Sequence, residues 1–146
     1  MAEKKVFLLA DYDFLDQMHD EIIDDIIVTD NQVELVFNSL RFTHKKNYKK
    51  ARIVFDDLED ANCDAYIRIY LEKQCIIEKG EVLYIDEFIK FMEKEKIKME
   101  VIDIMSGYNL IMIQGQFMNS DNSYRDENFQ LYISTEKISY VFSESD

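Results

Sequence analysis

Short segments in which apolar and polar residues alternate recur along this chain, and they constrain its fold more than any other feature. In AYIRIYL (65–71), two tyrosines and an arginine occupy alternate positions, with two isoleucines and a leucine between and after them. Val33, Leu35 and Phe37 alternate with their neighbours in the same way, and the pattern returns at 130–134. A period of two residues is typical of a β-strand with one face on the core. The chain is therefore predicted to be rich in strands.

The predicted strands come mostly in consecutive pairs joined by short connections, which favours antiparallel pairing. Asp30 and Asn31 suit a hairpin turn between the first two strands, because both residue types tolerate positive φ angles. The first strand has a less regular pattern, which a bulge near Asp24-Asp25 would explain; a short helix is the alternative. The predicted strands are 21–29, 32–42, 51–55, 65–71, 98–105, 109–117, 129–134 and 138–142.

One helix is predicted at about residues 84–96, where apolar residues from Ile85 to Met92 fall on a single stripe at helical spacing. Asp86, or a residue just before it, can cap the N-terminus of this helix. The segment Phe7–Met18 has apolar residues near helical spacing, interrupted by aspartates, and is predicted as a short N-terminal helix or a turn.

These elements together predict the α+β class: a mostly antiparallel β-sheet or sandwich with one principal helix. The length of 146 residues and the hydrophobic fraction of 47% suit one domain, spanning residues 1–146, with its own core.

The turns of this chain must be built without the usual residues, since there is no Pro and there are only three Gly. Asn, Asp and Ser are expected to take their place. Gly107 suits a hairpin turn. Gly115 lies inside a predicted strand and indicates a bulge or a close approach of two backbones.

The charge of the chain is strongly acidic, with 30 Asp and Glu against 17 Lys and Arg and a formal net charge of -13. Such a surface repels nucleic acid and anionic membranes and attracts a basic protein. No secretion signal precedes the two cysteines, and no stretch reaches the length of a membrane helix. A cytoplasmic protein with reduced thiols is therefore predicted.

An acidic cluster near the N-terminus is the first candidate site. It is a partner-binding patch or simply a solvated surface, and its spacing does not match a calcium-binding loop, so no metal site is predicted. The candidate contacts are Asp11, Asp13, Asp16, Asp20, Asp24 and Asp25.

A basic stretch, Arg41–Arg52, holds six basic residues and no acid in an otherwise acidic chain. It is predicted to be a solvated connection between strands, with two alternatives. One is a contact with the acidic surface of the same chain or of a second copy, which would make a homo-oligomer. The other is nucleic-acid binding, which the acidity of the whole chain opposes. The candidate patch residues are Lys45, Lys46, Lys49 and Lys50.

No catalytic residue is predicted. His19-Asp20 lacks the additional histidines of a metal phosphohydrolase, and the glycines form no phosphate-binding loop, so no cofactor is expected. Four tyrosines are candidates to line a small-molecule pocket: Tyr66, Tyr70, Tyr132 and Tyr140. Four methionines are predicted to fill the core: Met99, Met105, Met112 and Met118.

The segment MHDEIIDDIIVTDNQVELVF, within Met18–Phe42, resembles the opening of small bacterial β-rich proteins, some of which are similar to immunity proteins of polymorphic toxin systems. The resemblance implies no catalytic residues. The function predicted is a non-enzymatic interaction module that binds a basic partner and is immunity-like. Its further candidate contacts are the acidic loops Asp56–Asp64 and Asp121–Glu127. A small-molecule-binding β domain or an enzyme without a recognised motif is the alternative.

Overall fold

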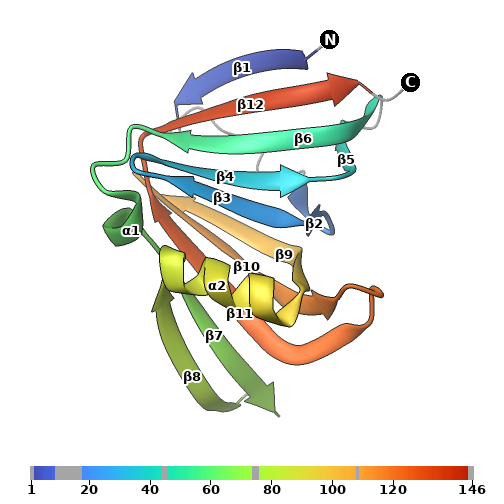
Figure 1. Ribbon diagram of the computed structural model, residues 1–146, viewed down its shortest axis with the longest axis vertical. Coiled ribbons are helices and arrows are strands. Elements are labelled where there is room, and N and C mark those ends of the chain that lie inside the picture. Colours follow the sequence, from blue (N-terminus) through green and yellow to red (C-terminus); the bar gives the residue numbers. More distant parts are fainter. Residues whose placement is uncertain (1, 9–17, 44–45, 74–75, 108, 145–146) are drawn as a thin grey trace.

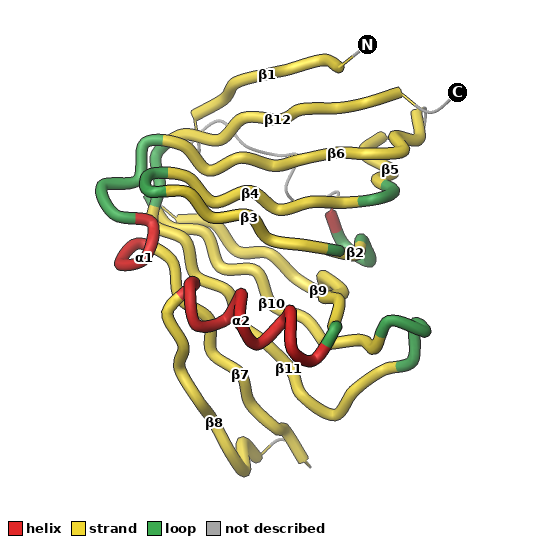
Figure 2. The backbone as a smooth tube through the Cα atoms, in the orientation of Figure 1, coloured by secondary structure: helices red, strands yellow, loops and turns green. Residues whose placement is uncertain are grey.

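In the computed structural model, two antiparallel β-sheets enclose a common core, and a helix lies against one of them (Figure 1). The structure describes residues 2–8, 18–43, 46–73, 76–107 and 109–144. For the strand segments 2–8, 40–43, 46–49, 73, 76–79, 140 and 142–144 it describes the backbone. Figure 2 shows how much of the described chain is strand.

Sheet A has the order β1-β12-β6-β4-β3, and β5 pairs with β6 beside β4. The two ends of the chain meet here, because β1 and β12 are neighbours along their whole length (Figure 1). The strands of sheet A are β1 (Ala2–Leu8), β3 (Asp25–Thr29), β4 (Gln32–Phe37), β5 (Leu40–Thr43), β6 (Lys46–Asp56) and β12 (Lys137–Glu144).

Sheet B has the order β2-β9-β10-β11-β7-β8. Long strands make up most of it, so it presents a broad surface on each side. Its strands are β2 (Ile22–Ile23), β7 (Ala65–Lys73), β8 (Ile76–Tyr84), β9 (Ile97–Gly107), β10 (Leu110–Asn119) and β11 (Tyr124–Ser134).

Two helices complete the described chain: α1 (Ala61–Asp64) and α2 (Ile85–Glu95). The strands of the two sheets converge near α1 and diverge away from it, and α2 lies where they diverge (Figure 1). Phe88 of α2 is fully buried, and its ring lies 5.9 Å from that of Phe117 in β10. Phe117 in turn lies 5.2 Å from Phe129 in β11, so an aromatic cluster holds α2 on the inner face of sheet B.

The chain crosses between the sheets at Asp24. The backbone before it pairs with β9, through the N–H of Val101 and the carbonyl oxygen of Glu21 (2.8 Å). The N–H of Asp24 itself donates to Val36 in β4 (2.8 Å), and from there the chain belongs to sheet A. The predicted interruption at Asp24-Asp25 is therefore a change of sheet and not a bulge, and the short-helix alternative is wrong.

The predicted fold class is confirmed: the chain is mostly antiparallel sheet with one principal helix. The hairpin at Asp30-Asn31 is also confirmed, since Thr29 pairs with Gln32 across it. The predicted helix is confirmed as α2. It begins at Ile85, so its N-cap lies just before Asp86, which is not the cap itself. Tyr84 occupies the N-cap position without a side-chain hydrogen bond there, because no Ser, Thr, Asp or Asn stands at that position.

The patterns did not predict two strands, β1 and β8. Each lies at the edge of its sheet, where it pairs with one neighbour only and needs no regular apolar alternation. Of the segment Phe7–Met18, predicted as a short helix or a turn, the structure describes only the two ends: Phe7 and Leu8 belong to β1, Met18 begins a 3-10 turn, and residues 9–17 lie outside the described ranges. The connection between the predicted strands 109–117 and 129–134 is shorter than expected, because β10 extends to Asn119 and β11 already begins at Tyr124.

Gly115 confirms the expected close approach of two backbones. The register of β9 against β10 shifts between Gln114 and Gly115, and a Cβ atom on Gly115 would lie 1.8 Å from the carbonyl oxygen of Glu100. Asn and Asp also take up positive φ angles as predicted, at Asp57 and Asn109 for example.

Candidate functional site

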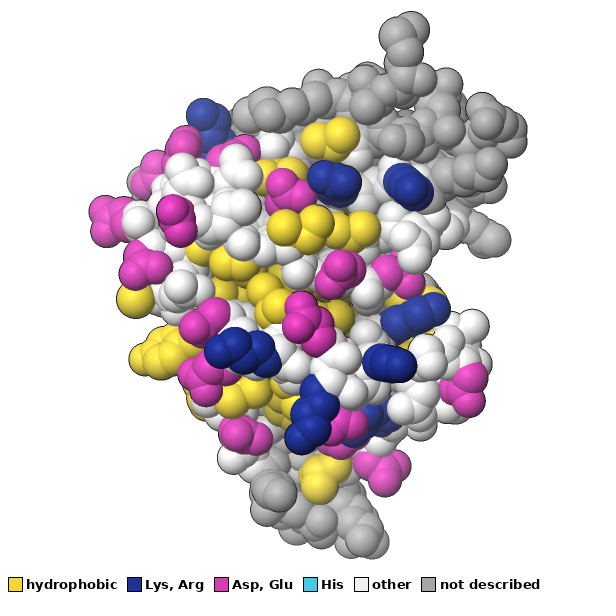
Figure 3. Space-filling view, viewed as in Figure 1, with side chains coloured by type: hydrophobic (Ala, Val, Ile, Leu, Met, Phe, Trp, Pro, Cys, Tyr) yellow, Lys and Arg dark blue, Asp and Glu magenta, His cyan; other side chains and the backbone are white. Residues whose placement is uncertain are grey.

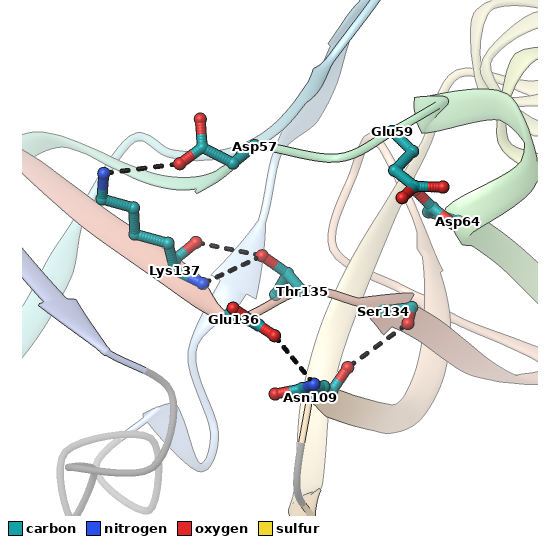
Figure 4. A pocket seen from close by; sticks show the side chains of 8 residues that line it. All are labelled: Asp57, Glu59, Asp64, Asn109, Ser134, Thr135, Glu136 and Lys137. Carbon is teal, nitrogen blue, oxygen red and sulfur yellow. Dashed lines mark hydrogen bonds and ion pairs between the residues drawn. The ribbon is translucent and has the colours of Figure 1, made fainter.

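A cleft opens at the end of the molecule where the sheets converge, between the β6–α1 loop, the β9–β10 turn and the β11–β12 connection (Figure 4). Its volume is about 580 Å³. We call it the acidic cleft. Its lining residues are Asp57, Glu59, Asp64, Asn109, Ser134, Thr135, Glu136 and Lys137.

One wall of the acidic cleft is the β6–α1 loop, which local interactions hold in place. The buried Leu58 anchors it, and the N–H of Leu58 donates to the carbonyl oxygen of Asn31 in the β3–β4 turn (3.1 Å). Asp60 caps α1, since its carboxylate accepts a hydrogen bond from the N–H of Asn62 (3.0 Å). These contacts fix the loop at Leu58 and Asp60, and the side chains of Asp57 and Glu59, on either side of Leu58, are exposed.

The opposite wall centres on Thr135, which is 5% exposed and joins sheet B to sheet A. Its N–H donates to the carbonyl oxygen of Asn109 (2.9 Å), and its hydroxyl donates to that of Asp56 (3.1 Å). Its hydroxyl oxygen also accepts from the N–H of Lys137 (3.2 Å). Beside it, the side-chain amide of Asn109 donates to Glu136 (3.0 Å). These bonds make the wall a single rigid unit.

The cleft carries an excess of negative charge, with four carboxylates and one ammonium group in its lining. Lys137 lies 3.4 Å from Asp57. Asp64 accepts a backbone hydrogen bond from Asp60 (3.2 Å). Within the described ranges, neither Asp64, Glu59 nor Glu136 pairs with a lysine or arginine. A cationic group entering the cleft would find acceptors that the described chain does not neutralise.

A carboxylate beside the lining, that of Asp60, acts on a neighbouring thiol. The Cys63 sulfur donates to Asp60 (3.3 Å), and this hydrogen bond, with the nearby negative charge, raises the pKa of the Cys63 thiol. The thiol is thereby kept in its neutral form. Among the described residues, no three His, Cys, Asp or Glu side chains are grouped so that they could hold a metal ion.

A second surface of interest is the outer face of sheet B, which points away from the core. Because Ile67, Leu131 and Ile113 are buried on the inner side, their strand neighbours lie on the outer side. We call the following ten residues the tyrosine face. One row across five strands is Met105, Met112, Tyr132, Tyr66 and Tyr84; the next is Asp103, Gln114, Gln130, Arg68 and Val82.

The tyrosine face is ordered by contacts among its own side chains. The rings of Tyr66 and Tyr132 stack at 4.8 Å with an interplanar angle of 13°. The Tyr132 hydroxyl donates to Gln130 (3.1 Å). Arg68 lies over the ring of Tyr70 in the next row (5.6 Å), while burial raises the pKa of the Tyr70 hydroxyl. The strand alternation was predicted here; the large exposed area at Met105 (57%) was not, since this methionine was assigned to the core.

The described members of the N-terminal acidic cluster do not line the acidic cleft. Asp24 and Asp25 line a separate cavity of about 290 Å³ beside the C-terminal end of α2. Asp24 accepts from the N–H of Asn38 (2.8 Å), and Asp25 from that of Ile26 (2.8 Å). Asp20 is exposed at a positive φ of 69°. The remaining three candidates, Asp11, Asp13 and Asp16, lie outside the described residues.

Of the two acidic loops, the one at 56–64 forms a wall of the cleft, as described. The acids of 121–127 are largely engaged elsewhere. Hydrogen bonds from Ser123 lower the pKa of Asp121. Arg125 lies 3.0 Å from Glu127 and 3.5 Å from Glu95 of α2, and its hydrogen bond lowers the pKa of Glu127. This group fastens the end of α2 to sheet B.

The basic stretch was predicted to be a connection between strands, and this prediction is wrong. The stretch is mostly strand itself. In β5 and β6, Leu40 pairs with Tyr48 and Thr43 with Lys46. The backbone N–H and C=O groups of a basic segment can pair like those of any other, so charge alone does not prevent a strand here. Of its four candidates, Lys50 is exposed; Lys45 and the side chains of Lys46 and Lys49 lie outside the description.

The predicted tyrosine-lined pocket is not formed by the tyrosines whose side chains the structure describes. Tyr66 and Tyr132 lie on the outer face of sheet B, and Tyr70 borders a cavity of about 160 Å³ beside Phe91 of α2. The side chain of Tyr140 is outside the description. On the side that carries α2, acidic and basic side chains are interspersed around an apolar centre (Figure 3).

Comparison with known proteins adds no relative. No protein-family model matches the chain, and no match was found among curated proteins or solved structures. Neither described helix has the length and apolar character needed to cross a bilayer.

Proposed function

We propose that this chain is a non-enzymatic protein-interaction module that binds a basic partner through the acidic cleft. The observation that carries the proposal is the convergence of four carboxylates on one concave site, where Lys137 is the only cation in the described lining. Inhibition of a basic toxin, which the resemblance of Met18–Phe42 to immunity-type proteins implies, is the form of this function that we favour.

Two physical arguments support a basic partner. A concave site walled by protein focuses the field of its charges and raises the local concentration of cations. In addition, the net charge of -13 accelerates the approach of a positively charged protein from any direction. The whole chain would steer the encounter, and the cleft would fix its position.

The alternative is a small-molecule site in the same cleft. Its volume of about 580 Å³ falls within the usual range for ligand sites. Its lining is mostly polar, however, whereas such sites are usually walled by apolar side chains. A small organic cation is therefore the ligand class that this alternative would require.

The test is a set of amide substitutions that keep the hydrogen-bond acceptors and remove the charge. The cleft variant is Glu59→Gln, Asp64→Asn and Glu136→Gln in one chain. The matched control removes three exposed carboxylates elsewhere, with Glu87→Gln, Glu93→Gln and Asp126→Asn, so both variants have the same net charge. Binding of a fluorescent ten-residue arginine peptide is measured by anisotropy over a range of salt concentrations.

We expect the cleft variant to lose about tenfold in affinity for the peptide and the control variant less than about threefold. An ion pair that is desolvated in the cleft contributes more binding free energy than the long-range attraction of an exposed carboxylate elsewhere. Affinity should fall as salt rises. Equal losses in the two variants would show binding to net charge alone and overturn the proposal. Full competition by spermidine at an equal concentration of charge would instead favour the small-cation alternative. A physiological partner should then be captured by the wild type and not by the cleft variant.

A further inference from the structure

The tyrosine face has the residue types of a buried interface in an otherwise highly charged chain. Charged residues make up 32% of the sequence, yet the ten residues of this face include one acid and one base. Interfaces are enriched in Tyr, Met and Arg and depleted of Lys, Glu and Asp. The exposed fractions are high where the face reaches the outer strands, at 57% for Tyr84 and 63% for Val82.

The charges and the apolar side chains of the face are arranged as a complementary pair of halves. In one row, Asp103 on β9 and Arg68 on β7 stand on either side of two glutamines. In the other row, Met105 on β9 and Met112 on β10 lie beside tyrosines on β11 and β7; Met105 is 57% exposed, whereas Met112 is 8% exposed. The carboxylate of one half can therefore bind the guanidinium group of the other half, and its thioether groups can pack on the aromatic rings of the other half.

A two-fold axis that runs along the strands between β10 and β11 brings these halves together. Such an axis, lying in the plane where two copies meet, places β9 of one copy over β7 of the other and keeps each row in line. Asp103 then faces Arg68 of the second copy, and Met105 faces Tyr66. Because the contact is isologous, each of these pairs occurs twice.

We propose that the tyrosine face is the interface of a symmetric dimer of this chain, with the Arg68–Asp103 pair formed between copies. A second copy fits better than a different basic protein, because a basic partner would need acidic residues that this face lacks. The ten residues form two rows on five strands about 4.8 Å apart, and each residue covers about two residue lengths of about 3.3 Å, which gives roughly 320 Å² per copy. The total of roughly 630 Å² lies below the roughly 1,000 Å² of a stable specific interface, so the dimer is a weak and transient one.

The net charge gives the dimer a distinctive salt dependence. Two chains of charge -13 repel each other at long range, while the face itself is neutral in its two rows. Salt screens the repulsion, so dimerisation strengthens as salt rises. Binding of a basic partner to the acidic cleft weakens under the same change. Failure of one proposal is therefore distinguishable from failure of the other.

The experiment is sedimentation velocity from about 5 to about 500 µM protein, at about 50 and about 500 mM NaCl. We expect a concentration-dependent rise from the monomer mass of 17.5 kDa towards twice that value, at lower concentrations in the higher salt. Arg68→Glu and Asp103→Arg should each weaken the dimer by at least about tenfold, because each places like charges together twice. The double variant should restore it. Lys90→Glu, on the exposed side of α2, is the matched control for Arg68→Glu.

A chain that stays monomeric at the highest concentration in both salts would overturn the proposal. So would a dimer that Lys90→Glu weakens as much as Arg68→Glu does, since it would use another surface. If both single variants weaken the dimer and the double variant does not restore it, the two-fold arrangement stated here is wrong.

Discussion

The outer faces of the two sheets use their side chains in opposite ways. On sheet A, Asp56 accepts hydrogen bonds from Gln32 (2.6 Å) and from the buried Ser139 (2.9 Å), and Arg52 lies 3.5 Å from Glu34. Polar groups there are satisfied within the chain. On sheet B, the tyrosine face leaves large apolar and aromatic surfaces exposed. Among the described residues, the outer side chains of sheet A therefore stabilise the fold, whereas several side chains of the tyrosine face keep area exposed for the proposed contact between copies.

The largest effect is expected where sheet B itself is built, at Gly115. Gly115→Ala should lower the free energy of unfolding by about 3 kcal/mol, because the new methyl group overlaps the backbone of Glu100 and the strands must move apart. Denaturant unfolding measures the change. Gly107→Ala is the control: no atom lies within 4 Å of its Cβ position, and a change below about 0.5 kcal/mol is expected. Similar effects of the two substitutions would mean that the register shift does not constrain sheet B.

A direct contrast between the outer faces comes next. Asp56→Ala on sheet A should destabilise by about 2 kcal/mol, because it leaves the buried Ser139 hydroxyl without its acceptor. Met105→Ser on sheet B should change the stability of the monomer by less than about 0.5 kcal/mol. Thermal or urea unfolding at low protein concentration gives both values. The comparison fails if the substitution of Met105 costs as much as that of Asp56.

The smallest effect concerns pH and the ion pair that fastens α2 to sheet B. The pKa of Glu127 is lowered in the folded state, so its pairing with Arg125 stabilises the protein above the ordinary Glu pKa and is lost as pH falls through the lowered value. Glu127→Gln should therefore reduce stability at neutral pH by less than about 1 kcal/mol and have little effect in strong acid. Urea unfolding at several pH values between neutrality and about pH 3 tests the sign. A substitution effect that grows as pH falls would contradict it.

The strand faces were predictable from the sequence because the two-residue period is a local property. The alternation in AYIRIYL predicts Tyr66 and Arg68 on the strand face opposite Ile67, and the apolar stripe at 85–92 predicts α2. The edge strands β1 and β8 were not predicted, since they lack a full apolar pattern. The acidity of 56–64 was evident in the sequence. The sequence did not show that the acids of this segment share one cleft with Glu136, because Glu136 lies far from them along the chain.

By itself, the sequence determined the strand-rich class, the single main helix, the Asn and Asp turns and the acidic surface, all of which depend on residues close together in the chain. Only the tertiary structure decided which strands are neighbours. The pairing of β7 with β11 brings Tyr66 onto Tyr132, and the crossing at Thr135 closes the acidic cleft. Strand order depends on how the faces of distant segments pack together, and alternation within a strand carries no information about its neighbour.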